Sequence, residues 1–139
     1  MKKTKKKTPQ QTRSKLREDC VYKWGLIVRN RDKHLCQWHL DRGEQVYGNQ
    51  PHHIIAQAQG NVARFTVDNG ITLCLYCHKW GINKDPVGFS DFVKLWLKKG
   101  GKDYYEMKER FLQTQKLSEK DYRQIKDNFE WVLKEMEGR

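Results

Sequence analysis

The sequence predicts an α+β fold in which a small centre rich in Cys, His and Asn lies between helical segments. Toward both ends of the chain, apolar residues recur every three or four positions, which is typical of one buried face of an α-helix. Between about residue 32 and residue 86 this periodicity stops, and short runs containing Gly, Asn, His and Cys replace it. Two brief stretches there, 51–55 and 70–73, have the character of β-strands. We therefore expect the chemistry of the protein in this centre.

Composition excludes two broad classes of protein. The chain has 139 residues, which suits one domain, and only 37% of them are hydrophobic. No stretch approaches the roughly 20 apolar residues that a membrane-crossing helix needs, so a transmembrane protein is excluded. The aromatic content of 12%, with five Trp, excludes a chain that is disordered throughout. The formal charge of +11 favours a polyanionic partner, most often nucleic acid.

The N-terminus is predicted to be a basic disordered tail over residues 1–13. Eight Lys and Arg residues lie in the first nineteen positions. Such a tail binds DNA phosphates without sequence preference by releasing counterions, and a solvated terminus without a partner is the alternative. No apolar segment follows the basic start, so we expect no secretory signal and a cytoplasmic location.

A first helix is predicted from Ser14 to about Arg31. Its apolar residues repeat at helical spacing and define one face: Cys20, Val21, Trp24, Ile27 and Val28. On this face, Cys20 is expected to be a small buried hydrophobic residue.

Three further helices are predicted after the centre. Apolar residues at helical spacing fall into three groups, at 92–97, 104–111 and 122–136. Ser118 and Asp121 are spaced as a capping box at the start of the last helix, and Gly100-Gly101 ends the first of the three. Most aromatic residues of these helices are expected in the core: Trp96, Phe111, Phe129 and Trp131.

Four residues of the centre have the spacing of zinc ligands. Cys36 and His39 form a C-x2-H pair, and Cys74 and Cys77 form a C-x2-C pair. A two-residue gap lets one tight turn direct both side chains at the same ion, and two such turns supply the four ligands of a structural zinc site. The competing interpretations are a disulfide and cysteines that are simply buried, and the expected reducing compartment disfavours the disulfide. His39 is the unusual member, because a Cys is more common at that place.

Between and after these pairs the sequence resembles the HNH endonucleases. The resemblance covers residues 36–78 and depends on three runs: Pro51-His52-His53-Ile54-Ile55, Asn69-Gly70, and Leu73-Cys74 followed by Cys77-His78. It implies a ββα-metal fold, in which a hairpin and a helix surround one catalytic divalent ion, often beside a structural zinc.

A narrower resemblance points to the phage recombination nucleases of the NinG type. It depends on the first helix and on four further stretches: Arg31-Asp32, Arg64-Phe65, Asp68-Asn69 and residues 96–105. His78 departs from that pattern, since those proteins are expected to have Asn there.

The resemblance assigns His52 and His78 to the catalytic ion and His53 to the role of general base. A neutral imidazole titrates near neutral pH, so it can take a proton from the water that attacks phosphorus. Adjacent residues on a strand point to opposite sides, so His52 and His53 are expected to have different roles. Asn69 is expected to hold the hairpin and thereby orient His53. The implied cofactors are structural zinc and a catalytic ion such as Mg2+, Mn2+ or Ni2+.

Other assignments stay open at this point. In one alternative, His52, His53 or His78 replaces His39 as the fourth zinc ligand. Asn83 lies where some relatives place a further ligand to the catalytic ion.

DNA contacts are expected from outside this catalytic core. Arg64, Lys79 and Lys84 are the candidate nucleic-acid-binding residues, with a solvated basic surface as the alternative. For Trp38 and Trp80, packing under the metal and stacking on a nucleobase are both open.

The combined prediction is a metal-dependent HNH endonuclease that hydrolyses DNA in a phage-related process such as recombination or packaging. The nuclease core with its N-terminal helix is assigned to residues 14–88 and a helical extension to 89–139. DNA is the expected partner, together with a second copy or a phage DNA-processing protein, because cutting both strands needs two sites. The alternatives are a nuclease for branched DNA or RNA, and a non-catalytic zinc-dependent DNA-binding module.

Overall fold

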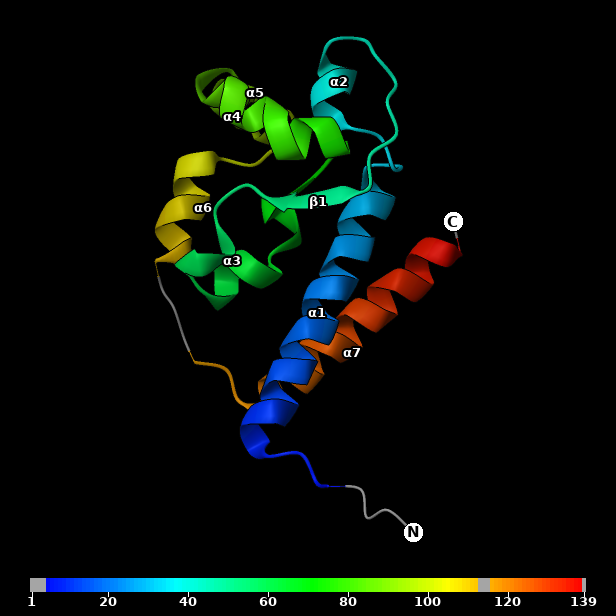
Figure 1. Cartoon of the computed structure of the whole chain (residues 1–139), viewed down its shortest axis with the longest axis vertical. Helices are drawn as coiled ribbons and strands as arrows, with labels where there is room; N and C mark the ends of the chain where they lie inside the picture. Colours follow the sequence, from blue (N-terminus) through cyan, green and yellow to red (C-terminus); the bar gives the residue numbers. More distant parts are fainter. Residues whose placement is uncertain (1–4, 113–115, 139) are drawn as a thin grey trace.

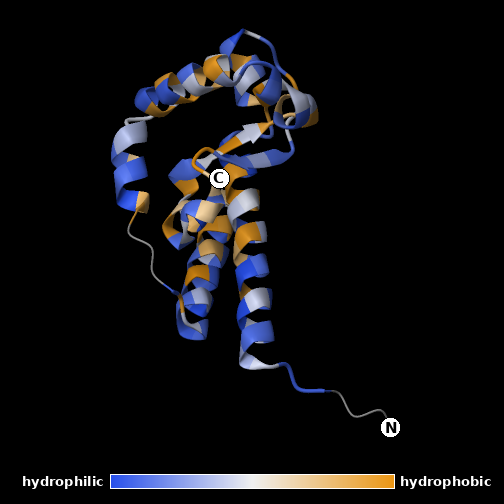
Figure 2. Cartoon of the chain, turned by 60° about the vertical axis from the view of Figure 1, so that its left-hand side comes forward, coloured by the Kyte–Doolittle hydropathy of each residue, from blue (hydrophilic) through white to orange (hydrophobic). Residues whose placement is uncertain are grey.

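Two long helices run side by side beneath a small mixed centre in the computed structural model, which describes residues 5–112 and 116–138. They are α1 (Pro9–Arg31) and α7 (Glu119–Glu137), and they run in the same direction (Figure 1). The first turns of α1 are mostly hydrophilic, whereas hydrophobic residues gather where the helices approach the hairpin (Figure 2). The α+β prediction is confirmed.

Helix α1 begins earlier than predicted, at Pro9 rather than Ser14. The Thr8 hydroxyl accepts a hydrogen bond from the backbone N–H of Gln11, and the Gln11 side chain accepts one from the backbone N–H of Thr8. This reciprocal cap and a proline in the first turn start the helix. The prediction of a disordered tail over 1–13 is therefore wrong for residues 9–13, while residues 1–4 lie outside the described residues.

The interface between α1 and α7 forms one part of the core. Cys20 is fully buried there, as predicted, and its thiol donates a hydrogen bond to the Tyr122 carbonyl across 3.4 Å. The same cluster contains apolar residues from both helices: Leu16, Trp24, Ile27, Val28 and Phe129. Four of the five residues on the predicted face pack in this cluster, whereas Val21 is half-buried outside it.

A two-stranded antiparallel hairpin lies against the C-terminal half of α1. Strand β1 (Gln50–His53) pairs with β2 (Gly70–Leu73). A Cβ atom at Gly70 would lie 2.8 Å from the Trp24 ring, so only glycine lets the hairpin approach α1 this closely. Strand β1 begins one residue before the predicted stretch and ends two residues before its end.

A buried charge network fixes the hairpin to the end of α1. Asp32, which caps the helix, accepts a hydrogen bond from the Thr72 backbone N–H at 2.9 Å. Arg31 pairs with Asp32 and also donates to the carbonyls of Val67 and Gly70. Strand β2 and the turn before it are thereby tied to one helix terminus.

Short elements connect the hairpin to the rest of the chain. In chain order they are α2 (Gln37–Asp41), η1 (Gln57–Gln59), α3 (Asn61–Phe65), η2 (Val67–Asn69), the π-helical turn η3 (Cys77–Gly81) and α4 (Ile82–Lys84). Two of them, η3 and α4, form one continuous helical segment after β2. This segment completes a strand–strand–helix unit.

The predicted C-terminal helices are α5 (Pro86–Lys99), α6 (Tyr104–Phe111) and α7. Gly100 caps the end of α5, and Ser118 with Asp121 forms the predicted capping box of α7. Phe111 and Phe129 are buried and Trp96 is half-buried. The prediction for Trp131 is wrong: it lies on the outer side of α7 and is 64% exposed. None of the described helices is long and apolar enough to cross a membrane.

Candidate active site and metal centre

Four residues form a compact candidate metal centre. The ligand atoms of Cys36, His39, Cys74 and Cys77 all lie within 4.8 Å of one another. Tetrahedral zinc, with bonds of about 2.0–2.3 Å, brings its ligand atoms to separations of roughly 3.5–4 Å. Three thiols and one imidazole are a typical donor set for structural zinc. These four residues are therefore positioned to bind a metal, consistent with zinc.

The local backbone explains how the four ligands converge. Cys36 precedes α2, which carries His39 on its first turn, and Cys74 directly follows β2. The backbone N–H of Cys77 donates to the Cys74 sulfur at 3.4 Å, which closes the tight turn expected of a C-x2-C pair. The cysteines are free, so the disulfide interpretation is wrong.

The thiols of this centre are shielded from water. Burial raises the pKa of the Cys77 thiol, and hydrogen bonding to Cys74 raises it further. A buried thiolate is stable when a cation compensates its charge, so this donor set fits a divalent ion. Because His39 is a member of the cluster, the alternative in which His52, His53 or His78 replaces it is not supported.

The centre also organises the surrounding core. Trp38 packs its ring against Phe89 and Phe92, at centroid distances of 5.0 and 6.2 Å, so the packing interpretation applies to Trp38. Trp80, in contrast, is 55% exposed.

His53 is held in one orientation at the end of β1. Its Nε2 atom lies 2.9 Å from the carbonyl oxygen of Arg64. Since a carbonyl only accepts, Nε2 must carry the hydrogen, and Nδ1 then has an unprotonated lone pair. The ring stacks on Trp24 at 3.8 Å between centroids with an interplanar angle of 5°. Burial lowers the pKa of His53, which keeps the ring neutral.

The sequence predicts Trp24 only as a core residue, and the structure shows in addition that its ring contacts His53. The indole N–H donates to the Thr66 carbonyl at 2.9 Å, which fixes the ring on which His53 stacks. Nothing in the local sequence indicates this contact, because the two residues are far apart in the chain and meet only when β1 packs on α1.

His52 and His78 approach each other from β1 and from η3. Their ring centroids are 5.3 Å apart, with the rings close to perpendicular. Nitrogen–metal bonds of about 2.1 Å place two imidazoles on one ion with centroids roughly 5 Å apart, so this pair fits a shared divalent ion. Burial and the neighbouring His78 and His53 lower the pKa of His52 to about 4, which leaves the imidazole lone pairs available at neutral pH.

Asn69 is fully buried behind the hairpin. Its side-chain NH2 donates to the carbonyls of Ile55 and Ala63, and its oxygen accepts from the backbone N–H of Ile55, each at 2.8 Å. These bonds fix the backbone that follows β1 and also fix Ala63. Ala63 directly precedes Arg64, and the Arg64 carbonyl accepts the hydrogen bond from His53. Among the described residues, the side chain of Asn69 forms hydrogen bonds to this backbone and none to the His53 ring.

Two of the three candidate nucleic-acid-binding residues share the helical segment formed by η3 and α4, and the third lies on α3. Arg64 is half-buried in α3 and donates to the Asn61 side chain at 2.7 Å. Lys79 and Lys84 are exposed on η3 and α4, and Lys84 donates to the Tyr76 hydroxyl at 3.2 Å. Asn83 is exposed beside Lys84.

The strand–strand–helix unit, with His52 and His53 on β1 and His78 on the following helical segment, defines a ββα-metal class of site. Comparison with protein families supports this class, since residues 34–80 match the family model described as HNH endonuclease. The chain thus contains an HNH domain, which indicates a nuclease in general. Searches of curated proteins and of solved structures found no match.

Proposed function

We propose that this protein is a metal-dependent HNH endonuclease that hydrolyses DNA, with His53 as general base. One observation supports this most strongly: the hydrogen bond from His53 to the Arg64 carbonyl leaves Nδ1 as the basic nitrogen. Because burial lowers the pKa of His53, the ring is neutral and this nitrogen can accept a proton from water.

The reaction follows from the state of the His53 ring. The oxygen of a water forms a bond to phosphorus while Nδ1 of His53 takes its proton. The bond between phosphorus and the 3′ oxygen breaks, and the leaving oxygen takes a proton from solvent. The products expected from the family resemblance are a 5′-phosphate and a 3′-hydroxyl. Stacking on Trp24 holds the imidazole in place throughout.

His52 and His78 are proposed to hold the catalytic ion. A divalent ion there would neutralise the negative charge that develops on the phosphate oxygens. Two imidazoles favour Ni2+ more strongly than Mg2+, and Mn2+ is also accepted by such sites. We also propose that a structural zinc ion is held by the centre formed by Cys36, His39, Cys74 and Cys77. This zinc would stabilise a hydrophobic core that is too small to hold the centre together alone.

The finer setting is proposed from the sequence resemblance. The protein would act on phage or host DNA in the cytoplasm, as a homodimer or with a DNA-processing partner. Arg64, Lys79 and Lys84 would contact phosphates, and residues 14–88 and 89–139 would be the nuclease core and its helical extension.

Cleavage of supercoiled plasmid tests the proposal. The wild-type protein, with its zinc retained, is expected to nick or linearise plasmid only after Mg2+, Mn2+ or Ni2+ is added. His53→Ala is expected to be inactive, whereas His34→Asn removes an imidazole elsewhere and retains activity. Asn suits this control because His34 has a φ of 55°.

A panel of substrates separates the alternatives. If the protein cuts only a four-way junction or only single-stranded RNA, that molecule is its substrate and ordinary duplex DNA is not. Zinc-loaded, folded protein that binds DNA but cuts none of these substrates would contradict the enzyme and favour a DNA-binding module.

A further inference from the structure

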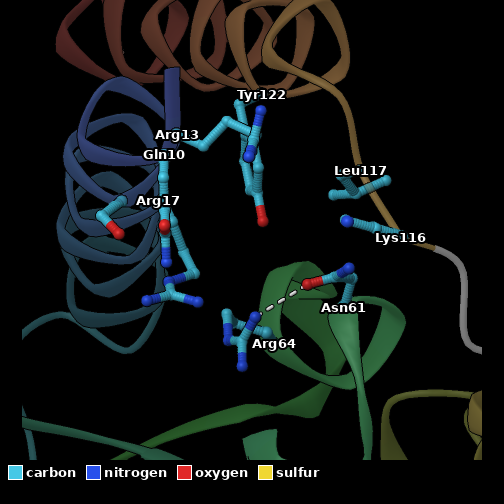
Figure 3. A pocket seen from close by; sticks show the side chains of 9 residues that line it. Gln10, Arg13, Arg17, Asn61, Arg64, Lys116, Leu117 and Tyr122 are labelled. Atoms are coloured by element: carbon cyan, nitrogen blue, oxygen red, sulfur yellow. Dashed lines mark hydrogen bonds between the residues drawn. The ribbon is translucent and has the colours of Figure 1, made fainter. Parts of the chain in front are cut away.

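A strongly basic cavity lies on the side of the molecule formed by α1, α3 and the segment before α7. It has a volume of about 560 Å3, and four cationic side chains line it: Arg13, Arg17, Arg64 and Lys116. They come from three separate parts of the chain and surround one opening (Figure 3). No Asp or Glu among the described residues lines this cavity.

The cations of this cavity lack the acidic ion-pair partners that neighbouring cations have. Within residues 5–112 and 116–138, none of the four forms an ion pair. By contrast, Lys15 on the same helix pairs with Asp19 at 3.1 Å, and Arg123 on α7 pairs with Glu119 at 2.7 Å. Four like charges around a concave surface repel one another, and a bound anion removes that cost.

The chemistry of the cavity fits a phosphate group. Guanidinium groups bind phosphate oxygens through two parallel hydrogen bonds, and Arg13 and Arg17 lie one helical turn apart on α1. Arg64 is held by its hydrogen bond to Asn61, so its charge is oriented before a ligand arrives. Gln10 and Ser14 add hydrogen-bonding groups to the lining.

The cavity is linked to the proposed catalytic site through Arg64. The side chain of this residue lines the cavity, while its backbone carbonyl accepts the hydrogen bond from His53 Nε2 at 2.9 Å. A second cavity of about 550 Å3 shares Arg17 and Arg64 with the first and reaches Gln57, four residues after His53. The two cavities thus extend from the first turns of α1 toward the segment that follows β1, with Arg17 and Arg64 between them and Glu18 in the lining of the second.

We propose that the cavity lined by Arg13, Arg17, Arg64 and Lys116 binds a backbone phosphate of the DNA strand, away from the bond that is cut. This inference rests on the proposed function, since it adds a second contact point for the same substrate. It also depends on the early start of α1, because Arg13 lies in a part of the chain that the sequence predicts to be disordered. Bound there, the strand is positioned relative to His53.

The test compares DNA binding by two double variants. Arg13→Ala/Arg17→Ala removes half of the cations and leaves the backbone around His53 intact. Lys108→Ala/Lys134→Ala removes the same charge from exposed positions on α6 and α7, outside the cavity. Zinc content and circular dichroism establish that both variants are folded. Affinity for a short labelled duplex is measured by fluorescence anisotropy without added catalytic ion, across a range of salt concentrations.

The expected result is a roughly tenfold rise in Kd for the Arg13/Arg17 variant, uniform across DNA sequences. The slope of log K against log salt should become shallower by about 1, as for one lost phosphate contact. The lysine control should change both quantities much less. Equal changes in the two variants would overturn the proposal, because they would show a general charge effect.

A second arm distinguishes a backbone phosphate from a terminal one. The same duplex is compared with 5′-phosphate and 5′-hydroxyl ends. Equal losses of affinity support a backbone phosphate, whereas a loss confined to the 5′-phosphorylated duplex would overturn it in favour of an end-binding pocket. This binding assay does not depend on cleavage. If the wild-type protein cuts no DNA but the Arg13/Arg17 variant still loses affinity, the nuclease proposal is contradicted and the phosphate-binding site is supported.

Discussion

The buried side chain of Asn69 offers the sharpest stability test of the proposed architecture. Asn69→Ala removes three hydrogen bonds of 2.8 Å and leaves the N–H of Ile55 and the carbonyls of Ile55 and Ala63 without these partners. Each buried backbone group left unsatisfied costs about 1–3 kcal/mol. Water entering the space left by the amide recovers part of this, so we expect a loss of about 3–5 kcal/mol in the free energy of unfolding. For a domain stable by about 5–15 kcal/mol, this is a large fraction.

Urea unfolding of the zinc-loaded protein, followed by Trp fluorescence, measures this loss. Asn49→Ala is the matched control, because Asn49 is exposed and its amide only accepts a bond from Gln50. The control is expected to change stability by less than about 0.5 kcal/mol. If Asn69→Ala cost less than about 1 kcal/mol, its three hydrogen bonds would not hold the segment between the strands, and the reasoning would fail.

Three further perturbations test separate parts of the structure. Gly70→Ala places a methyl group against Trp24 and Val28, so it should lower the free energy of unfolding by about 1–3 kcal/mol in the same urea assay; an unchanged midpoint would contradict the close packing of β2 on α1. Cys74→Ser should release the zinc, measured by atomic absorption, and lower the thermal midpoint; full retention of zinc would show that Cys74 is not a ligand. His78→Ala should weaken binding of Ni2+ or Mn2+ about tenfold or more by calorimetry while structural zinc stays bound; unchanged affinity would remove His78 from the proposed ion site.

Much of the fold could be predicted because each signal was local. The C-x2-H and C-x2-C pairs converge because each forms a single turn, and the serine cap of α7 acts within four residues. The same kind of signal marks the start of α1. Thr8 and Gln11 have the spacing of a capping box with Pro9 between them, yet the dense positive charge around them favoured a disordered tail. The structure shows that the cap prevails over the charge.

The features that could not be predicted depend on packing between distant segments. Stacking of His53 on Trp24 requires β1 to lie on α1, and the Arg64 carbonyl reaches His53 only because Asn69 folds the intervening loop. Trp131 illustrates the opposite error. Trp131 lies among apolar residues at helical spacing and is therefore expected in the core. However, α7 packs on α1 along one side only, and Trp131 lies outside that side.

The rate of DNA cleavage by His53→Ala tests the central claim most directly. The rate is measured under single-turnover conditions with saturating divalent ion, on protein shown to be folded by its zinc content, with His34→Asn as control. Loss of a general base predicts a fall of about 100- to 10,000-fold relative to the wild type, with the control unchanged. A folded, zinc-loaded His53→Ala variant that cleaves at the wild-type rate would contradict the assignment of His53 as the base.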